Sequence, residues 1–351
     1  MLPIVTKSRG DDECPRELRL GPYAESLWND LSRTLPGATL YHRDHWIELL
    51  TRAYALPLWL ATLHNGDTIV AAGLFARAPL SGRFISLPFS DTCPPLAQRP
   101  EAAQHLLQAL MEHSPSRRTY EIRGIAGEPP WETVECFVTW ALNLDRLLAQ
   151  IEKTLGVNFR RNLRRASQQP IKIERGSGIN LLERFYALQL ATRRRLGLPP
   201  QPWRFFELAR EIFAAEGKFE VWIAQDNGND TAGAVFLRDG DVVHYKWGAR
   251  RPSLPSLANH LLLWNAIEEF APHARILDLG RTDVRNRGLM RFKKELGASA
   301  SPLPSAFYPK APRQVSSESL SGASSIAAQI WRRLPIFATE LGGRILYRFL
   351  G

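Results

Sequence analysis

The stretch FEVWIAQDNGNDTAGAVFLRDGDVVHYKW, residues 219–247, decides the fold. It holds three runs rich in β-branched, aromatic and other apolar residues, at 219–224, 231–238 and 242–247. The first two runs are separated by Asn227-Gly228-Asn229-Asp230, a sequence typical of a hairpin turn. We therefore predict three consecutive strands that pair as an antiparallel meander.

Helical periodicity surrounds this meander, and the same order of elements occurs twice in the chain. In the second half, helices at 181–213 precede the strands, and a helix at 259–270 and a short strand at 275–279 follow them. The matching elements of the first half lie at 24–55, 58–63, 65–67 (a turn), 69–76, 84–87, 102–112 and 119–123. An internal duplication is the economical explanation. Each copy is expected to be a compact α+β unit with a mixed, mostly antiparallel sheet flanked by helices.

The duplication divides the chain into four predicted parts: an N-terminal extension at 1–20, a first domain at 21–152, a second domain at 153–312 and a C-terminal segment at 313–351. The last part begins with a Ser/Gly-rich linker. From Ile326 onward, apolar residues recur at spacings of three and four with arginines among them, which predicts a basic amphipathic tail. Docking of 326–351 on an anionic membrane and packing of this tail on the protein's own body both fit that pattern.

Composition narrows the class of protein. The three cysteines among 351 residues form no CxxC pair, so neither a disulfide framework nor a zinc site is expected, and no other metal site is predicted. The N-terminus lacks a signal-peptide apolar region, and no apolar run reaches the roughly 18 to 20 residues of a membrane-spanning helix, so a cytoplasmic location is expected. A net charge of +10 indicates an anionic partner such as tRNA, phospholipid headgroups or a diphosphate-linked substrate. No signature of DNA binding accompanies this charge.

Five short sequence segments in the second half indicate a known family. They are Thr192-Arg193-Arg194-Arg195-Leu196-Gly197, Tyr245-Lys246-Trp247-Gly248-Ala249, Asn259-His260-Leu261-Leu262-Leu263-Trp264, Leu277-Asp278-Leu279-Gly280-Arg281-Thr282 and Gly288-Leu289-Met290-Arg291-Phe292-Lys293-Lys294. In this order they resemble FemAB-like proteins, which are related to peptidoglycan bridge-forming aminoacyltransferases and to GNAT acyltransferases. The resemblance covers roughly 58–309. It implies two tandem GNAT-like domains that transfer an acyl or aminoacyl group to an amine of a cell-envelope precursor, related to peptidoglycan or exopolysaccharide.

The resemblance leaves the donor open among acyl-CoA, an acyl-carrier protein and an aminoacyl-tRNA, with no tightly bound cofactor expected. Bridge-forming members that read tRNA carry a two-helix arm, whereas Leu198-Pro199-Pro200-Gln201-Pro202 leads directly into the next helix. Acetyl-CoA enzymes hold the pyrophosphate on a Gly-rich turn before a helix, and the segment 250–256 contains no glycine. Neither departure selects a donor.

Acyl transfer to an amine needs a positive or hydrogen-bonding group near the oxygen that gains charge in the tetrahedral intermediate. Lys293, positioned by Phe292, is the first candidate, with a solvated Lys-Lys pair as the alternative. Asp278 is placed at the end of a strand, and Arg281 and Asp283 in the loop after it. We expect Arg281 to bind a phosphate or carboxylate and Asp283 to accept the amine proton, unless the two merely brace the turn.

Five further residues are predicted to contact substrate. Strand alternation places Tyr245 and Trp247 on one face, although an aromatic residue on a strand more often packs in a core. Asn259 and His260 stand at a helix start, as capping or site groups. Asp91 follows a strand in the first half and has turn formation as its alternative role.

A helix between the two halves carries four arginines within six residues. They are Arg160, Arg161, Arg164 and Arg165, and solvation or anion binding both account for them. A second functional reading follows from this run and the tail: a non-catalytic protein that retains the duplicated fold and holds an anionic membrane or a polysaccharide intermediate. That protein would bind lipid in a salt-sensitive way and turn over no donor.

Overall fold

The computed structural model describes residues 4–8, 16–78, 82–113, 118–251, 257–312, 326–334 and 339–343. It contains two compact units. Unit 1 comprises the described residues of 1–135 and 303–315, and unit 2 those of 136–302 and 316–350. These units differ from the predicted ranges, because the chain crosses between them near 135 rather than 152 and returns to unit 1 at 303.

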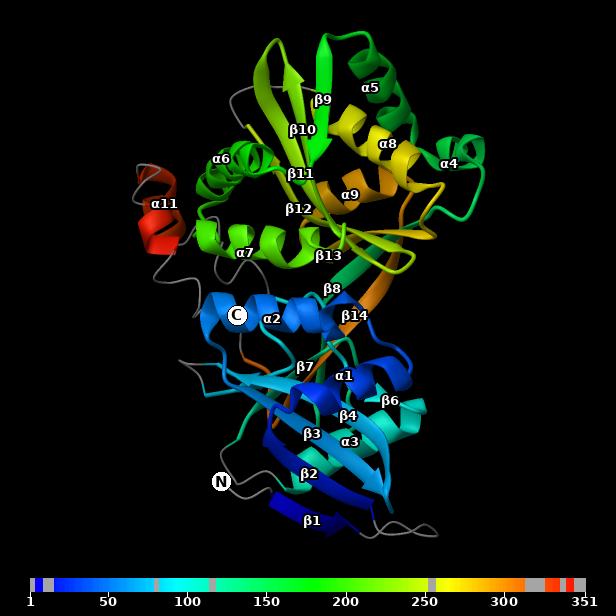
Figure 1. Cartoon of the computed structure of the whole chain (residues 1–351), viewed down its shortest axis with the longest axis vertical. Helices are drawn as coiled ribbons and strands as arrows, with labels where there is room; N and C mark the ends of the chain where they lie inside the picture. Colours follow the sequence, from blue (N-terminus) through cyan, green and yellow to red (C-terminus); the bar gives the residue numbers. More distant parts are fainter. Residues whose placement is uncertain are drawn as a thin grey trace. The chain divides into compact units, whose positions relative to one another are not determined.

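Unit 2 holds the quoted meander in a mixed sheet of order β8-β13-β12-β11-β10-β9 (Figure 1). Its strands are β8 (Glu132–Asn143), β9 (Ile171–Gly176), β10 (Phe219–Asp226), β11 (Asn229–Asp239), β12 (Val242–Arg250) and β13 (Ile276–Asp283). Its helices include α4 (Leu148–Thr154), α5 (Val157–Ser167), α6 (Ile179–Leu196), α7 (Trp203–Ala214), α8 (Ala258–Phe270) and α9 (Arg287–Glu295). All neighbouring strands are antiparallel except β12 and β13, which are parallel.

Unit 1 repeats this topology in the order β1-β2-β3-β4-β5-β7-β14. Its strands are β1 (Ile4–Ser8), β2 (Arg16–Pro22), β3 (Leu58–Asn65), β4 (Thr68–Arg77), β5 (Phe84–Ile85), β6 (Leu96–Ala97), β7 (Tyr120–Arg123) and β14 (Ser299–Tyr308). Its helices include α1 (Glu25–Thr34), the short η1 (Leu40–His42), α2 (Asp44–Tyr54) and α3 (Pro100–Glu112). The predicted duplication is confirmed, because both units run from an antiparallel meander through a helix to a parallel strand pair.

The strand that closes each sheet lies far in sequence from the strand with which it pairs. β8 follows most of unit 1 in sequence and pairs with β13, and β14 follows most of unit 2 and pairs with β7. Neither strand was among the predicted elements. The predicted N-terminal extension also needs correction, since β2, which begins at Arg16, pairs with β3 over seven residues.

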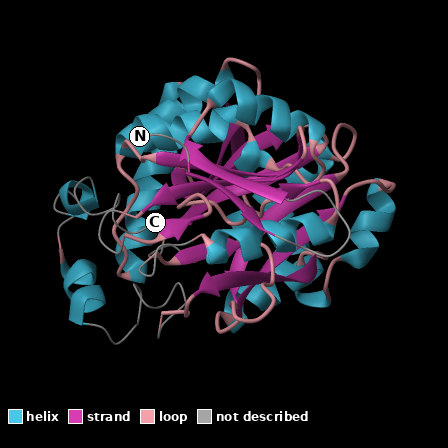
Figure 2. Ribbon diagram, turned by 90° about the horizontal axis from the view of Figure 1, so that it is seen from below, coloured by secondary structure: helices cyan, strands magenta, loops and turns pink. Residues whose placement is uncertain are grey.

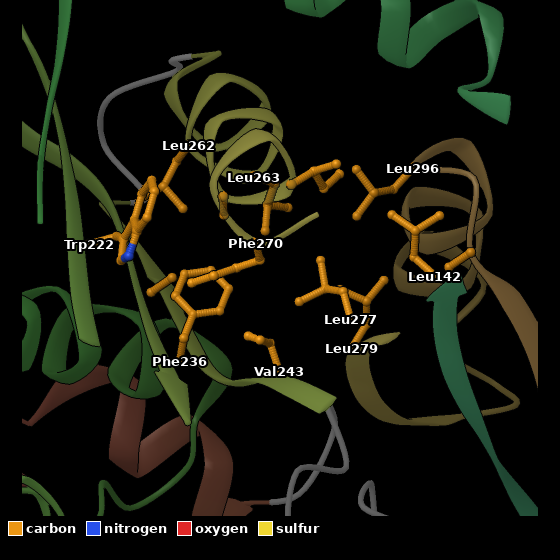
Figure 3. Packing of buried hydrophobic residues seen from close by; sticks show 14 of the residues in the cluster. Leu142, Trp222, Phe236, Val243, Leu262, Leu263, Phe270, Leu277, Leu279 and Leu296 are labelled. Atoms are coloured by element: carbon orange, nitrogen blue, oxygen red, sulfur yellow. The ribbon is translucent and has the colours of Figure 1, made fainter. Parts of the chain in front are cut away.

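Helices lie against the strands (Figure 2), and in unit 2 they form two apolar layers. On one face, Leu262, Leu263 and Phe270 of α8 pack with Trp222 and Phe236 (Figure 3). All five side chains are almost fully buried. Burial of each stabilises the fold by roughly 1.5–3 kcal/mol, so α8 is firmly held on the sheet.

The other face of the unit 2 sheet carries α6 and α7. Gly233 lets α6 approach closely, because a Cβ there would lie 3.1 Å from side-chain atoms of Leu188 and Phe185. Trp247 packs between Phe205 and Phe206 of α7, with ring centroids 5.5 and 5.2 Å apart. Trp247 is therefore a core residue, which was the alternative to a substrate contact in the sequence analysis.

A β-bulge in β12 overturns the expected common face of Tyr245 and Trp247. Val235 pairs with Trp247 and the next residue of β11, Phe236, pairs with Tyr245, so Lys246 is an extra residue. Because one extra residue reverses the alternation, Tyr245 packs beside Phe236 on the α8 face, with ring centroids 5.7 Å apart. Trp247 lies on the opposite face.

The C-terminal segment packs on unit 2 as far as it is described. α11 (Ile326–Arg333) contacts α6, and Ala328 is fully buried. Gly197 ends α6 with a φ of +73°, and a Cβ there would lie 2.8 Å from the Ala328 carbonyl oxygen. Arg332 and Arg333 are exposed. Packing on the protein's own body thus describes α11, while residues 335–338 and 344–351 of the predicted tail lie outside the described residues.

Glu295 of α9 caps the first turn of α5. Its carboxylate accepts hydrogen bonds from the side chain of Asn158, at 3.1 Å, and from the backbone N–H groups of Asn158 and Phe159, at 3.2 and 3.4 Å. A Cβ on Gly156 would clash with this carboxylate. These hydrogen bonds, that of the Asn158 side chain foremost, hold the pKa of Glu295 below its ordinary value.

We expect Glu295→Gln to lower the free energy of unfolding by about 1 kcal/mol at pH 7, the usual contribution of a helix cap. Because the pKa is depressed in the folded state, this stabilisation is present above the ordinary carboxyl pKa and is lost as the pH falls through the folded value. Thermal unfolding of wild type and variant between pH 7 and pH 3 should show the difference shrinking. Glu152→Gln, an exposed change on α4, is the control and should have no such effect. A pH-independent difference would contradict the capping role.

Candidate active site

β12 and β13 separate towards their carboxyl ends. They pair through three residue pairs, Val242 with Ile276, Val243 with Leu277 and His244 with Asp278. Beyond these pairs β12 continues to Arg250, while β13 keeps its pairing with β8 on its other edge. Crevices at the carboxyl ends of parallel strands are common ligand sites in sheets.

Asp278 sits where the two strands part. Its Oδ2 lies 2.8 Å from His244 Nδ1, and its Oδ1 accepts the backbone N–H of Gly280 at 2.8 Å. A bulge in β13 falls between Asp278 and Gly280, and Gly280 has a φ of +69°. Asp278 therefore holds the last β12–β13 pair and the bulge together.

A cavity of about 530 Å³ lies at this separation. It is bordered by the end of α6, by β11 and β12, by the start of α8, by Leu279 of β13 and by α9. Its lining residues are Thr192, Arg195, Leu196, Thr231, Ala232, Tyr245, Gly248, Ala249, Arg250, Arg251, Ala258, Asn259, His260, Leu263, Leu279, Asn286, Gly288, Leu289, Phe292, Lys293 and Leu296. Apolar walls with a few polar groups are typical of small-molecule sites.

Lys293 is the buried cation of this site. It is 5% exposed, and its Nζ donates to the carbonyl oxygens of Leu279, Gly280 and Arg281, at 2.7, 3.0 and 3.3 Å. An ammonium has three protons, so these carbonyls account for all of them. Lys293 is therefore not part of a solvated Lys-Lys pair, which was the alternative interpretation of the sequence. It brings a fixed positive charge to the cavity and holds the bulged backbone of β13.

Tyr245 supplies a neutral hydrogen-bond donor to the same cavity. Burial raises the pKa of its phenol to about 12, so the hydroxyl keeps its proton at neutral pH. Within the part of the chain that the structure describes, this hydroxyl has no hydrogen-bond partner. Gly248 leaves the space that it occupies, since a Cβ on Gly248 would lie 1.8 Å from the hydroxyl oxygen.

Phe292 and His260 line the cavity, and the buried Phe159 of α5 packs against both. The His260 ring lies 4.9 Å from Phe159 and 5.7 Å from Phe292, measured between centroids. Its Nε2 is 3.3 Å from the side-chain nitrogen of Asn162. Burial lowers the pKa of His260, against an opposing effect of the Leu257 carbonyl, so the ring is neutral near pH 7. The neighbouring Asn259 also lines the cavity.

Two arginines stand together on the rim. Burial, and secondly the nearby positive charge of Arg250, lower the pKa of Arg195. Among the described residues, neither guanidinium pairs with a carboxylate. Thr192 ties the two segments together, because its Oγ1 donates to the Arg250 carbonyl and accepts the Arg250 N–H, both at 2.9 Å. Unpaired like charges held close together favour the binding of an anion.

Three further residues predicted for the site make other contacts. The Arg281 guanidinium lies over the Phe137 ring, 4.8 Å from its centroid. Asp283 ends β13, where its carboxylate accepts the Arg285 N–H at 2.9 Å, which fits the predicted alternative of bracing the turn. β13 extends through both residues, so the expected loop after Leu279 is wrong. Asp91 of unit 1 accepts the Tyr41 hydroxyl at 2.6 Å.

The structure also brings together residues that were not predicted for the site. Arg195, Arg250 and Gly248 come from α6 and β12, and Arg195 and Gly248 stand within the quoted segments. Their meeting depends on the packing of α6 on β12, which no local pattern encodes. Among the described residues, no cluster of three or more His, Cys, Asp or Glu side chains is arranged to hold a metal ion. None of the described helices is long and apolar enough to cross a bilayer.

A second cavity, of about 580 Å³, lies in unit 1 between α3 and residues 125–131. Among the described residues that line it, Glu101 and Glu128 are charged and none is a lysine or an arginine. These residues offer no lysine or arginine charge to a developing oxyanion. The unit 2 cavity is the better candidate on this ground.

Comparisons with known proteins agree with the fold. Residues 157–294 match the family model described as an acetyltransferase (GNAT) domain. No curated protein sequence matches the chain. The crystal structure of FemX is similar, with a TM-score of 0.58 and 15% identity over 82% of this chain and 96% of that chain.

Two other solved structures share the architecture. The C-terminal domain of a putative lysylphosphatidylglycerol synthetase from Agrobacterium fabrum gives a TM-score of 0.53 and 11% identity over 81% of this chain and 92% of that chain. A tandem GNAT protein from the clavulanic acid biosynthesis pathway gives a TM-score of 0.52 and 12% identity over 85% of this chain and 100% of that chain. At these identities the likeness concerns the fold.

Proposed function

We propose that the chain is a FemAB-like acyltransferase whose unit 2 cavity binds the acyl group of an activated donor, and that this group is transferred to an amine. The match of residues 157–294 to a GNAT domain and the tandem GNAT fold support this proposal. One observation carries this proposal. A neutral phenol and a fixed ammonium, those of Tyr245 and Lys293, line one cavity at the point where β12 and β13 part.

The acyl carbonyl is attacked by the lone pair of a free amine, which forms a C–N bond and a tetrahedral intermediate. The carbonyl oxygen then carries negative charge, and the Tyr245 hydroxyl donates a hydrogen bond to it. Lys293 adds a positive charge whose position is fixed by three carbonyls. Collapse breaks the bond to the leaving thiol or hydroxyl. That group gains one proton and the amine nitrogen loses one, so the reaction is balanced without a cofactor.

The donor enters along the edge of β12 that faces away from β11. An extended, amide-bearing arm matches such an edge, because strand edges recognise extended chains through main-chain hydrogen bonds. Arg195 and Arg250 then bind a phosphate of the donor at the rim. A phosphate is present in acyl-CoA, in the arm of an acyl-carrier protein and in aminoacyl-tRNA, so this contact is common to all three donors.

We expect the double variant Arg195→Gln/Arg250→Gln to raise the KM for the donor by roughly 10- to 100-fold, since charge-assisted hydrogen bonds contribute about 1.5–3 kcal/mol. The kcat should change little, because both arginines lie on the rim rather than at the reacting carbon. Steady-state kinetics at varied donor concentration measure the effects on KM and kcat separately. The control is Arg204→Gln, which removes an exposed arginine of α7 that pairs with Glu207. A fall in kcat at unchanged KM would contradict the assigned role.

We propose that the acceptor is the amine of a cell-envelope precursor, on the inner side of the cytoplasmic membrane. The resemblance to FemAB-like proteins supports this acceptor, as does the shared fold with FemX and with a putative lysylphosphatidylglycerol synthetase. The large positive charge also fits a diphosphate-linked or lipid-linked acceptor.

The proposal is tested by incubating the protein with isotopically labelled acyl-CoA, acyl-carrier protein or aminoacyl-tRNA and an extract of envelope precursors. We expect labelled mass on an amine in the presence of one donor, detected by mass spectrometry. Failure of every donor with folded protein would favour the non-catalytic binder instead.

A further inference from the structure

We propose that an exposed surface on α4 and α5 of unit 2 docks on an anionic lipid bilayer. This α4–α5 surface consists of Leu147, Val157, Arg161, Arg164 and Arg165. The inference goes beyond the transfer reaction and does not depend on the identity of the donor. The two helices follow one another in the chain and both belong to unit 2 (Figure 1).

Two apolar side chains project from this surface. Among the large hydrophobic residues in the described ranges, Leu147 and Val157 are the most exposed, at 72% and 71%. They stand at the beginnings of α4 and α5, and α4 is only seven residues, or about 10 Å, long. At both positions, contact of the apolar side chain with water costs free energy that burial in a bilayer would recover.

The arginines of α5 continue the surface from Val157. Residues 157, 161, 164 and 165 share one helix face by their spacing of four, three and one. All four are exposed, whereas Phe159 and Ala166 on the other side of α5 are buried. In the described part of the chain, Arg164 and Arg165 have no carboxylate partner, and Arg161 contacts only the amide oxygen of Asn158. The positive charge of this face is therefore uncompensated.

Arginines next to protruding aliphatic side chains fit a lipid surface better than a nucleic acid. Headgroups attract the cations while the aliphatic groups enter the region below them. Recognition of single-stranded RNA instead relies on aromatic stacking, and the α4–α5 surface has no aromatic residue. A bilayer is therefore the partner that uses both components of the surface.

The test is sedimentation of the full-length protein with phosphatidylcholine vesicles that contain from 0 to about 40% phosphatidylglycerol, a range over which the negative surface potential goes from weak to strong. We expect binding that rises with the anionic fraction and falls with salt. Arg161→Gln/Arg164→Gln/Arg165→Gln should weaken binding about 100-fold, since each basic residue near the surface contributes roughly fivefold. Leu147→Ser/Val157→Ser should weaken it about tenfold at unchanged charge.

Matched controls separate this surface from net charge and from the C-terminal segment. Arg19→Gln/Arg33→Gln/Arg52→Gln removes the same charge from unit 1 and should leave binding within about threefold, as should Arg332→Gln/Arg333→Gln on α11. Equal losses in all charge variants, or none in the Leu147/Val157 variant, would overturn the proposal. The proposal would also be overturned if the Arg161/Arg164/Arg165 variant lost tRNA binding but kept vesicle binding, because the surface would then be an RNA site. Circular dichroism of each variant verifies folding.

Discussion

Tyr245→Phe should lower kcat by about 100- to 1,000-fold, the usual effect of removing one donor to a developing oxyanion. The phenol is protonated at neutral pH because burial raises its pKa to about 12. Its hydroxyl donates no hydrogen bond to another described residue, so its removal should leave the free energy of unfolding nearly unchanged. The KM for the donor should also remain similar. Initial rates at saturating donor and acceptor measure the effect.

Tyr186→Phe is the matched control. The Tyr186 hydroxyl donates to the Gln201 carbonyl at 3.2 Å, and Tyr186 does not line the unit 2 cavity. Its loss should lower the melting temperature without lowering kcat. A Tyr245→Phe enzyme that retains kcat within about threefold would remove Tyr245 from the chemical step.

Lys293→Met should reduce both stability and activity. Methionine preserves most of the side-chain length but leaves the carbonyls of Leu279, Gly280 and Arg281 without this donor. An unsatisfied buried polar group costs about 1–3 kcal/mol, so we expect a loss of about 3 kcal/mol after local relaxation. Loss of the positive charge at the cavity should lower kcat by about 100-fold.

Urea unfolding and kinetics at a temperature where the variant remains folded separate the two effects. The adjacent Lys294→Met is the control, because Lys294 is exposed on the same helix and should change neither quantity strongly. A stable Lys293→Met enzyme with normal kcat would contradict both roles. A destabilised enzyme with normal kcat would leave Lys293 as a purely structural residue.

The sequence predicted the repeated architecture because its signals are local. Each meander consists of apolar runs around an Asn-Gly turn, and Gly66 and Gly228 do adopt positive φ angles of 59° and 75° there. The arginine-bearing helix expected between the two halves is confirmed for the same reason, as α5 (Val157–Ser167). Local periodicity is sufficient for such elements.

The closing strands escaped prediction because their pairing is distant in sequence. Asn143 of β8 pairs with Ile276, and Ser305 of β14 pairs with Arg123. β14 also contains Pro302 and Pro304, which are unusual within a strand. Only tertiary pairing gives these segments their conformation.

The site was predicted in part, and each difference has a local cause. The lining residues Tyr245, Asn259, His260, Phe292 and Lys293 were all among the predicted site residues. The bulge at Lys246 moved Trp247 to the opposite face. The extension of β13 placed Arg281 and Asp283 within a strand. Bulges have weak sequence signals, and they shift the facing of every residue that follows.

The most direct test of the central claim is photocrosslinking of the donor that supports transfer, with a diazirine on its acyl group. Peptide mapping should find the label in β12 (Val242–Arg250) and α9 (Arg287–Glu295), and excess unlabelled donor should abolish it. Competed labelling of α3 or of residues 125–131 instead would place the acyl group in the unit 1 cavity. That result would contradict the assignment of acyl transfer to the separation of β12 and β13.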